Sequence, residues 1–162
     1  MTERNKSNLV EIYEAVAAME MVVDGQNVTG FGPSEALDAV PNAYLPARLL
    51  TPISRFSENT GIAGSTWNVS MGSTVNRVDW QVNELFLYEP MNATIGIKAI
   101  AGPLLEYCVT FLQTIANGGL VLPVNAVVTN VSFRPDVIEY PLFSGHAFYG
   151  VATTILIMEK IP

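Results

Sequence analysis

The sequence has few charged residues and a single cysteine, and each shortage excludes a class of protein. Asp, Glu, Lys and Arg make up only 14% of the 162 residues, against about 25% in an average globular domain. Eight residues are Lys or Arg and the net charge is −7, so a tightly bound nucleic acid is not expected, because phosphates require clustered cations. A single cysteine, Cys108, excludes an internal disulfide framework and fits a reducing cytoplasm.

Long apolar runs are also missing. The longest, from Val151 to Met158, has the length of a strand and falls short of the ~20 residues that span a membrane. The first eight residues are polar, without the apolar core of a secretory signal. We therefore expect no membrane insertion. A chain of 162 residues is most economically one domain, residues 1–162.

Apolar residues are nevertheless plentiful, at 49% of the chain. With so little charge to cover the surface, this composition favours a subunit that hides part of its exterior in an assembly. A monomer rich in small residues is the alternative.

The first half of the chain predicts a helix, a short strand and a hairpin. Helical spacing begins after a cap at Ser7 or Asn8 and continues to near Met21. A strand from Ala47 to Thr51 lies between Pro46 and Pro52, which indicates an edge strand, or one that cannot be extended. A short helical turn is expected between residues 33 and 41.

The segment from Ser54 to Thr74 is long for an ordinary loop, and such loops are usually functional or disordered. Its last part alternates as a strand, so we expect it to pair with residues 78–88 in a hairpin that turns at residues 72–74. In that second strand Val78, Trp80 and Val82 alternate with polar residues, but every residue after Glu84 is apolar as far as Tyr88. Both faces of this strand must therefore be covered, and a second copy of the protein is one candidate for the cover.

The second half predicts a helix and two strands. Apolar residues recur at i, i+3 and i+4 from Ile97 to Ile115, and two glycines end the pattern. Gly102-Pro103 either kinks this helix or marks where its regular part starts. The first strand is expected to place Val127, Thr129, Val131 and Phe133 on one face, and the last, from about His146 to Glu159, is apolar or small on both faces, as in a central strand. The fold class predicted is α+β, an antiparallel or mixed sheet with two main helices on one face and a long β-hairpin.

Residues that could carry catalysis are scarce. His146 is the only histidine, and its place at the start of a strand is typical of a structural residue. Cys108 and His146 could in principle act as nucleophile and base, but Cys108 lies on the apolar stripe of the second helix. No residues have metal-ligand spacing, and the glycine-rich stretches lack the lysine of a phosphate-binding loop. We expect no enzyme activity, no metal and no cofactor.

Aromatic and arginine residues around the predicted hairpin form the candidate interface, because such residues dominate binding energy at interfaces. The candidates are Arg55, Phe56, Trp67, Met71 and Arg77. Burial in the core is the alternative for Phe56 and Trp67, and plain solvent exposure is the alternative for Arg77. The neighbouring Trp80 is expected in the core.

The order of elements resembles one protein family. An N-terminal helix leads to the strand in "LPARLLTP", then to a hairpin whose second strand reads "RVDWQVNELFL". An amphipathic helix ending in glycine and a last strand "FYGVATTILIMEK" follow. This pattern, which covers nearly the whole chain, resembles the tail terminator (tail completion) proteins of long-tailed bacteriophages.

The resemblance implies a structural virion protein that forms a ring, expected to be hexameric. Such a ring ends growth of the tail tube, joins the tail to the head-side connector protein, and lies at the neck-proximal end of the tail after assembly in the host cytoplasm. Its partners would be its own copies, the tail-tube protein and the connector, while DNA passes through without tight binding. The stretch from Asn27 to Asn42 has no role in this pattern. Another head–tail connector or minor tail subunit is an alternative, and a monomeric α+β domain that binds a small apolar ligand is an alternative of another class.

Overall fold

Nine helices and strands account for most of the residues that the computed structural model describes, which are 8–32, 44–50, 67–71, 76–91, 97–139 and 147–161, with only the backbone at 67–71, 76, 97–98 and 139. The elements are α1 (Leu9–Ala17), β1 (Met21–Val23), β2 (Gln26–Phe31), β3 (Ala47–Leu50), β4 (Trp67–Met71), β5 (Asn76–Pro90), α3 (Ile97–Ala116), β6 (Ala126–Glu139) and β7 (Ala147–Ile161).

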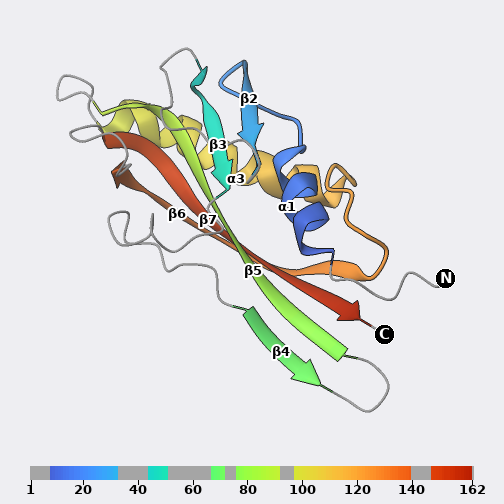
Figure 1. Ribbon diagram of the computed structural model, residues 1–162. Helices are drawn as coiled ribbons and strands as arrows, with labels where there is room; N and C mark the ends of the chain where they lie inside the picture. The colour runs from blue at the N-terminus through green and yellow to red at the C-terminus, as the bar shows by residue number, and fades with distance from the viewer. Residues whose placement is uncertain are drawn as a thin grey trace.

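The strands form one mixed sheet in the order β1-β2-β3-β5-β7-β6, and β4 pairs with β5 beside this path (Figure 1). The pair β2–β3 is parallel, whereas β5 is antiparallel to β3, β4 and β7. Side chains of α1 and α3 share one apolar cluster with β5 and β7, so both helices cover the same face of the sheet. The expected α+β class with two main helices on one face is confirmed.

Strand β5 changes character at Glu84, as its sequence predicts. Val78, Trp80, Val82 and Phe86 point to the helix-covered face and belong to its cluster. On the opposite face, Leu85 and Leu87 join a second cluster with Ala47, Leu49, Ile138, Phe148 and Ala152. The period of two along a strand makes this division, because successive side chains point to opposite faces.

The second face of β5 does not require a second copy of the protein. Leu85 and Leu87 are 1% and 0% exposed within a single chain. The hypothesis that a neighbouring subunit covers these leucines is therefore wrong, and any contact between copies must use other residues.

The expected central position of β7 is confirmed, since β5 and β6 flank it on either side. The predicted face of β6 is wrong in its first part. A register shift lies between Val128 and Asn130, and such a bulge adds one residue and reverses which side chains face the core. Val128, Val131 and Phe133 pack on the core, whereas Val127 is 49% exposed.

Helix α1 is shorter than its apolar spacing predicts. It ends at Ala17 rather than near Met21, which instead begins β1. The positive φ angles of Asp24 and Gly25 form the two-residue turn of a β1–β2 hairpin, a turn that favours such residues. Sequence patterns did not predict this hairpin. Strand β2 gives the first part of residues 27–42 a role, as the parallel partner of β3.

Strand β3 is not an edge strand, because β2 and β5 flank it. The remaining alternative, a strand that cannot be extended, fits its four residues. The hairpin of β4 and β5 pairs Trp67 with Trp80 and Met71 with Asn76, which confirms the expected pairing.

Helix α3 begins at Ile97, so Pro103 lies inside it rather than at its first position. Its end follows the glycine signal. Gly118 has φ +80°, its N–H donates to the carbonyl of Ile115, and the N–H of Gly119 donates to that of Thr114. These two bonds form a Schellman motif, which requires a left-handed residue at Gly118.

Candidate functional site

The candidate interface lies at one end of the sheet. In Figure 1, β4 and the first half of β5 extend at the lower right, away from α3. Trp67 and Met71 are the two end residues of β4, and only their backbone is described. Arg55 and Phe56 lie outside the described residues.

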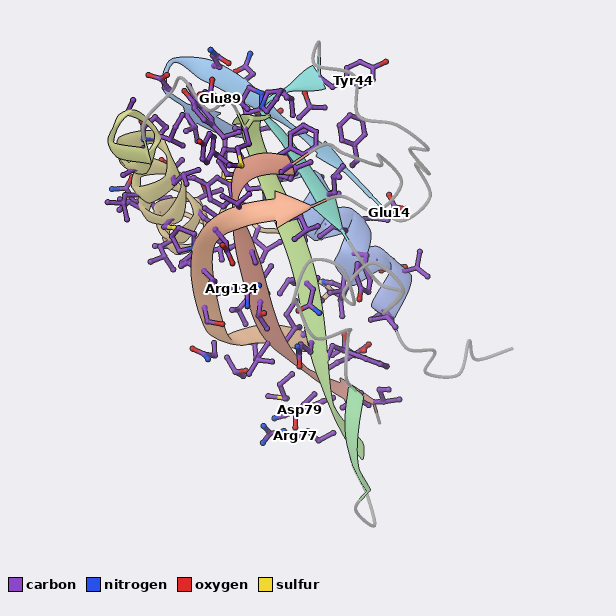
Figure 2. All side chains as sticks on the ribbon, turned by 90° about the vertical axis from the view of Figure 1, so that its left-hand side faces the viewer. Glu14, Tyr44, Arg77, Asp79, Glu89 and Arg134 are labelled. Atoms are coloured by element: carbon purple, nitrogen blue, oxygen red, sulfur yellow. The ribbon has the colours of Figure 1, made fainter. Side chains whose placement is uncertain are left out.

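Arg77 is the predicted interface residue whose side chain the structure places. Figure 2 shows Arg77 beside Asp79 at the hairpin end. The Arg77 Nε donates to Asp79 Oδ1 at 3.0 Å, and the Arg77 side chain is 55% exposed. An exposed ion pair of this kind contributes little to stability, so Arg77 is available for contact at the surface.

Trp80 lies in the core, as expected, and its indole belongs to a buried polar site. Trp80 Nε1 donates to Oε2 of Glu159 at 2.7 Å. The other carboxylate oxygen of Glu159, Oε1, accepts the backbone N–H of Asn8 at 2.8 Å. Asn8 occupies the N-cap of α1 without a side-chain capping bond, and its Nδ2 donates to Asn125 Oδ1 at 3.1 Å. Asn8 is thus the N-cap residue that the sequence predicts, and the Glu159 carboxylate accepts its backbone N–H, as the glutamate of a capping box does.

The second polar site holds the opposite end of the same helix. Arg48 donates from Nη1 to the carbonyl of Val16 at 3.0 Å, and from Nη2 to those of Ala17 at 3.0 Å and Met19 at 2.7 Å. Helix α1 therefore has a carboxylate at its N-terminus and a guanidinium at its C-terminus. Both charges match the helix dipole, and both satisfy backbone groups that a helix end leaves unpaired.

Glu84 balances the charge of Arg48. The Arg48 Nη1 and Glu84 Oε2 are 2.9 Å apart, and the two side chains are 1% and 0% exposed. The hydroxyl of Tyr107 on α3 donates to Glu84 Oε1. Burial, and then the Glu84 carboxylate, raise the pKa of Tyr107 well above its usual value, so the phenol remains protonated and able to donate.

Aromatic stacking fixes the Tyr107 ring. Its centroid lies 3.9 Å from that of Phe86, with the planes 1° apart, and Phe111 meets Tyr107 at 5.9 Å and Phe133 at 5.5 Å. The polar site and these rings join α3, β5 and β6 on the helix-covered face. Sequence patterns did not predict this centre. The signal that could have found it is a charged residue, Arg48 or Glu84, inside an apolar strand, because a buried charge requires a partner.

The described residues show limited means for chemistry. Among them, no three His, Cys, Asp or Glu side chains gather as a metal site. Cys108 is half-buried, and burial raises the pKa of its thiol. His146 lies outside the described residues.

Two edge strands of the sheet differ in how they are protected. Strand β6 has a bulge near Thr129 and contains Pro135. It also carries an ion pair, in which Arg134 Nε and Asp136 Oδ2 are 3.6 Å apart. These are features that prevent an edge from pairing with another chain. Strand β4, whose sequence is WNVSM, has no charge and no proline, and among the described strands it pairs with β5 alone.

Helix α3 presents apolar residues on both sides. Ile100, Leu104, Tyr107 and Phe111 are buried in the core, whereas Leu105, Val109 and Leu112 are 60%, 53% and 48% exposed. By length and composition, residues Ala99–Ala116 could cross a membrane. However, one side of the helix packs against β5, β6 and β7 in the core cluster, as in the core helix of a folded domain.

Two grooves border the helices. One, of about 600 Å³, lies at the end of α1 and is lined by residues 17–22 together with Asn27, Val28 and Gly30. The other, of about 280 Å³, lies between α3 and the strands β6 and β7, and its lining is mainly apolar: Ala101, Leu104, Leu105, Pro135, Asp136, Val137 and Tyr149.

Comparisons with protein-family models and with curated proteins find no match to this chain. Its function must therefore be argued from the sequence and from the geometry described above.

Proposed function

We propose that this chain is a structural virion protein, a tail terminator of a long-tailed bacteriophage. In this role it forms a ring, six copies by the resemblance, that ends growth of the tail tube and joins the tail to the head-side connector. It acts by contact and not by catalysis.

The observation that carries the proposal is the β4–β5 hairpin, in which β4 has β5 as its only partner among the strands that the structure describes. The hairpin extends at one end of the sheet (Figure 1), and β4 is uncharged and paired with β5 alone among the described strands. An edge of this kind can accept a strand from another chain through backbone hydrogen bonds. This geometry supports a contact with the tube protein or with the adjacent ring.

The rest of the molecule supports a passive, rigid subunit. Both ends of α1 are held by buried charges, Glu159 and Arg48, and α3 is held by the hydroxyl of Tyr107. A rigid scaffold fixes the direction of the projecting hairpin before binding. Less conformational entropy is then lost when the partner binds.

The test is a tube-length assay with purified tail-tube protein. When the protein is added at a molar concentration well below that of the tube subunits, it should shorten the tubes seen by electron microscopy. Asn68→Lys should abolish the effect, because a charge on β4 blocks strand addition. The hairpin itself should persist, since Asp79 lies opposite residue 68 and can pair with the new lysine.

The matched control is Asn130→Lys, an exposed position on the protected edge strand β6. This variant should shorten tubes as the wild type does. Tubes of unchanged length with wild-type protein would overturn the proposal.

The alternative of a small-ligand-binding monomer has less support. The apolar groove between α3 and the sheet measures about 280 Å³, at the lower end of the roughly 300–1,000 Å³ of typical ligand sites. The groove at the end of α1 is larger, about 600 Å³, but its lining is more polar than apolar, which does not suit a small apolar ligand.

A further inference from the structure

A long part of the chain carries no charge at all. Residues 107–133 contain no Asp, Glu, Lys, Arg or His, although the whole chain has a net charge of −7. This uncharged segment covers the second half of α3, the connection to β6 and the first half of β6. Two copies that repel each other elsewhere can approach most easily across such a surface, because like charges are absent from it.

Among the residues that the structure describes, the most exposed large apolar side chains lie within this segment. Val121 is 78% exposed and Val124 fully exposed. We name these two valines the knob. Neighbouring Leu120 and Leu122 pack on the core, and Ala126 N donates to the carbonyl of Pro123 at 3.0 Å. The knob is therefore held out from the surface by an anchored connection.

The opposite end of α3 offers a groove of matching chemistry. The groove between α3, β6 and β7, of about 280 Å³, is lined mainly by apolar side chains such as Ala101, Leu104 and Val137. We name it the α3 groove. Its one charged lining residue, Asp136, is paired with Arg134 at 3.6 Å, and Asp136 Oδ1 accepts the N–H of Val137.

A chain cannot place its own knob in its own α3 groove. Ala101 in the groove and Ala116 at the end of α3, where the connection to the knob begins, lie fifteen residues apart, which corresponds to roughly 22 Å of helix. Knob and groove are thus at two ends of one molecule. A contact between two different surfaces joins subunits head to tail, and it closes into a ring when the rotation between subunits allows.

We propose that the knob of one copy seats in the α3 groove of the next, so that copies of this chain join head to tail. This contact is the surface by which ring subunits meet. That the joined copies close into a ring rests on the proposed function. A second copy is favoured over a membrane as the occupant. A helix that lies in a membrane surface is rich in Lys and Arg on its polar face, whereas α3 contains one basic residue, Lys98.

The experiment uses the full chain and light scattering after size exclusion over a range of concentrations. Val124→Asp alters the knob, and Ala101→Trp fills the groove from an exposed position on α3. Each variant alone should raise the concentration of half-association at least about tenfold. Val10→Asp is the matched control, because Val10 is 69% exposed on α1, and it should associate as the wild type does.

The decisive sample is an equal mixture of the two defective variants. The intact knob of Ala101→Trp can enter the intact groove of Val124→Asp, and no further contact is possible. The mixture should therefore give a dimer of twice the 17.6 kDa subunit mass. Circular dichroism checks folding, and Val121→Asp replaces Val124→Asp should the latter not fold.

Several results would overturn the contact: a wild-type monomer at every concentration, normal association of both variants, or no dimer in the mixture. Co-sedimentation of wild-type protein, but not Val124→Asp, with phosphatidylcholine vesicles would identify a membrane as the occupant instead.

The tube-length assay separates the two proposals. Tubes shortened equally by wild type and Val124→Asp overturn the contact alone, whereas a mixed dimer without any effect on tubes overturns the proposed function alone.

Discussion

Arg48 on β3 and Glu84 on β5 form an ion pair in the core, with 2.9 Å between Nη1 and Oε2 and almost no exposure of either side chain. In the antiparallel register Arg48 lies opposite Phe86, and Glu84 lies opposite Leu50. The two charges are thus diagonal neighbours on the helix-covered face. Because Arg48 also holds the end of α1, the pair connects the sheet to its first helix.

Removing one partner of this pair should be costly. Arg48→Met leaves Glu84 buried without its cation and leaves the last carbonyls of α1 without their donor. The expected loss in the free energy of unfolding is about 3–5 kcal/mol, measured by urea denaturation. The double variant Arg48→Met/Glu84→Leu should recover part of it, and equal stability of single variant and wild type would contradict the prediction.

Gly30 permits the close approach of β2 to the end of α1. A Cβ atom at residue 30 would lie 2.1 Å from the carbonyl oxygen of Ala17 and 2.7 Å from Arg48 Nη2. Gly30→Ala should therefore lower the free energy of unfolding by about 1–3 kcal/mol.

The matched control for Gly30 is Gly102→Ala on α3. A Cβ at Gly102 meets nothing within 4 Å, and alanine has the higher helix propensity, so a gain of about 0.5–1 kcal/mol is expected. If both variants change stability by the same amount in denaturant melts, the steric account of Gly30 is wrong.

Glu159 accepts hydrogen bonds from Trp80 and from the N-terminus of α1. Glu159→Leu removes the acceptor of both bonds, while Glu159→Gln keeps an amide oxygen in the same place. We expect Leu to cost about 1–3 kcal/mol more than Gln, with faster amide hydrogen exchange in the first turn of α1. Exchange in the first turn of α1 that is as slow in Glu159→Leu as in the wild type would show that Glu159 does not hold this helix.

Alkaline pH should destabilise the fold. Burial, together with the bond to Asp24, raises the pKa of Tyr88 from 10.0 to about 12, and Tyr88 OH donates to Asp24 Oδ2 at 2.6 Å. Above pH 10 the unfolded chain releases the phenol proton that the folded protein retains, so the free energy of unfolding falls as pH rises from about 10 to about 12. The raised pKa of Tyr107 acts in the same direction.

The measurement is urea denaturation at about pH 9 and about pH 11. Wild type should lose stability between the two, and Tyr88→Phe should lose less, because it has one fewer phenol to titrate. A Tyr88→Phe loss as large as that of wild type would assign the alkaline effect to other groups.

Local periodicity determined much of this fold. The spacing of apolar residues in α3 and the glycines after it predict the helix and its end, since both signals act within a few residues. The alternation in β5, and its change at Glu84, predict which side chains face the helices and where the opposite face becomes apolar. The candidate interface was identified from residue types alone, and of its members only Arg77 has a described side chain.

Tertiary structure decided the rest. The partnership of Arg48 with Glu84, and of Glu159 with Asn8 across 151 positions of sequence, depends on strand order, which no local pattern encodes. The bulge in β6 exposes Val127 because β7 sets the register, and β3 is internal because β2 adds to it in parallel. Such long-range pairings form only when the chain collapses around a shared core, so the sequence supplies the charged residues but the fold selects their partners.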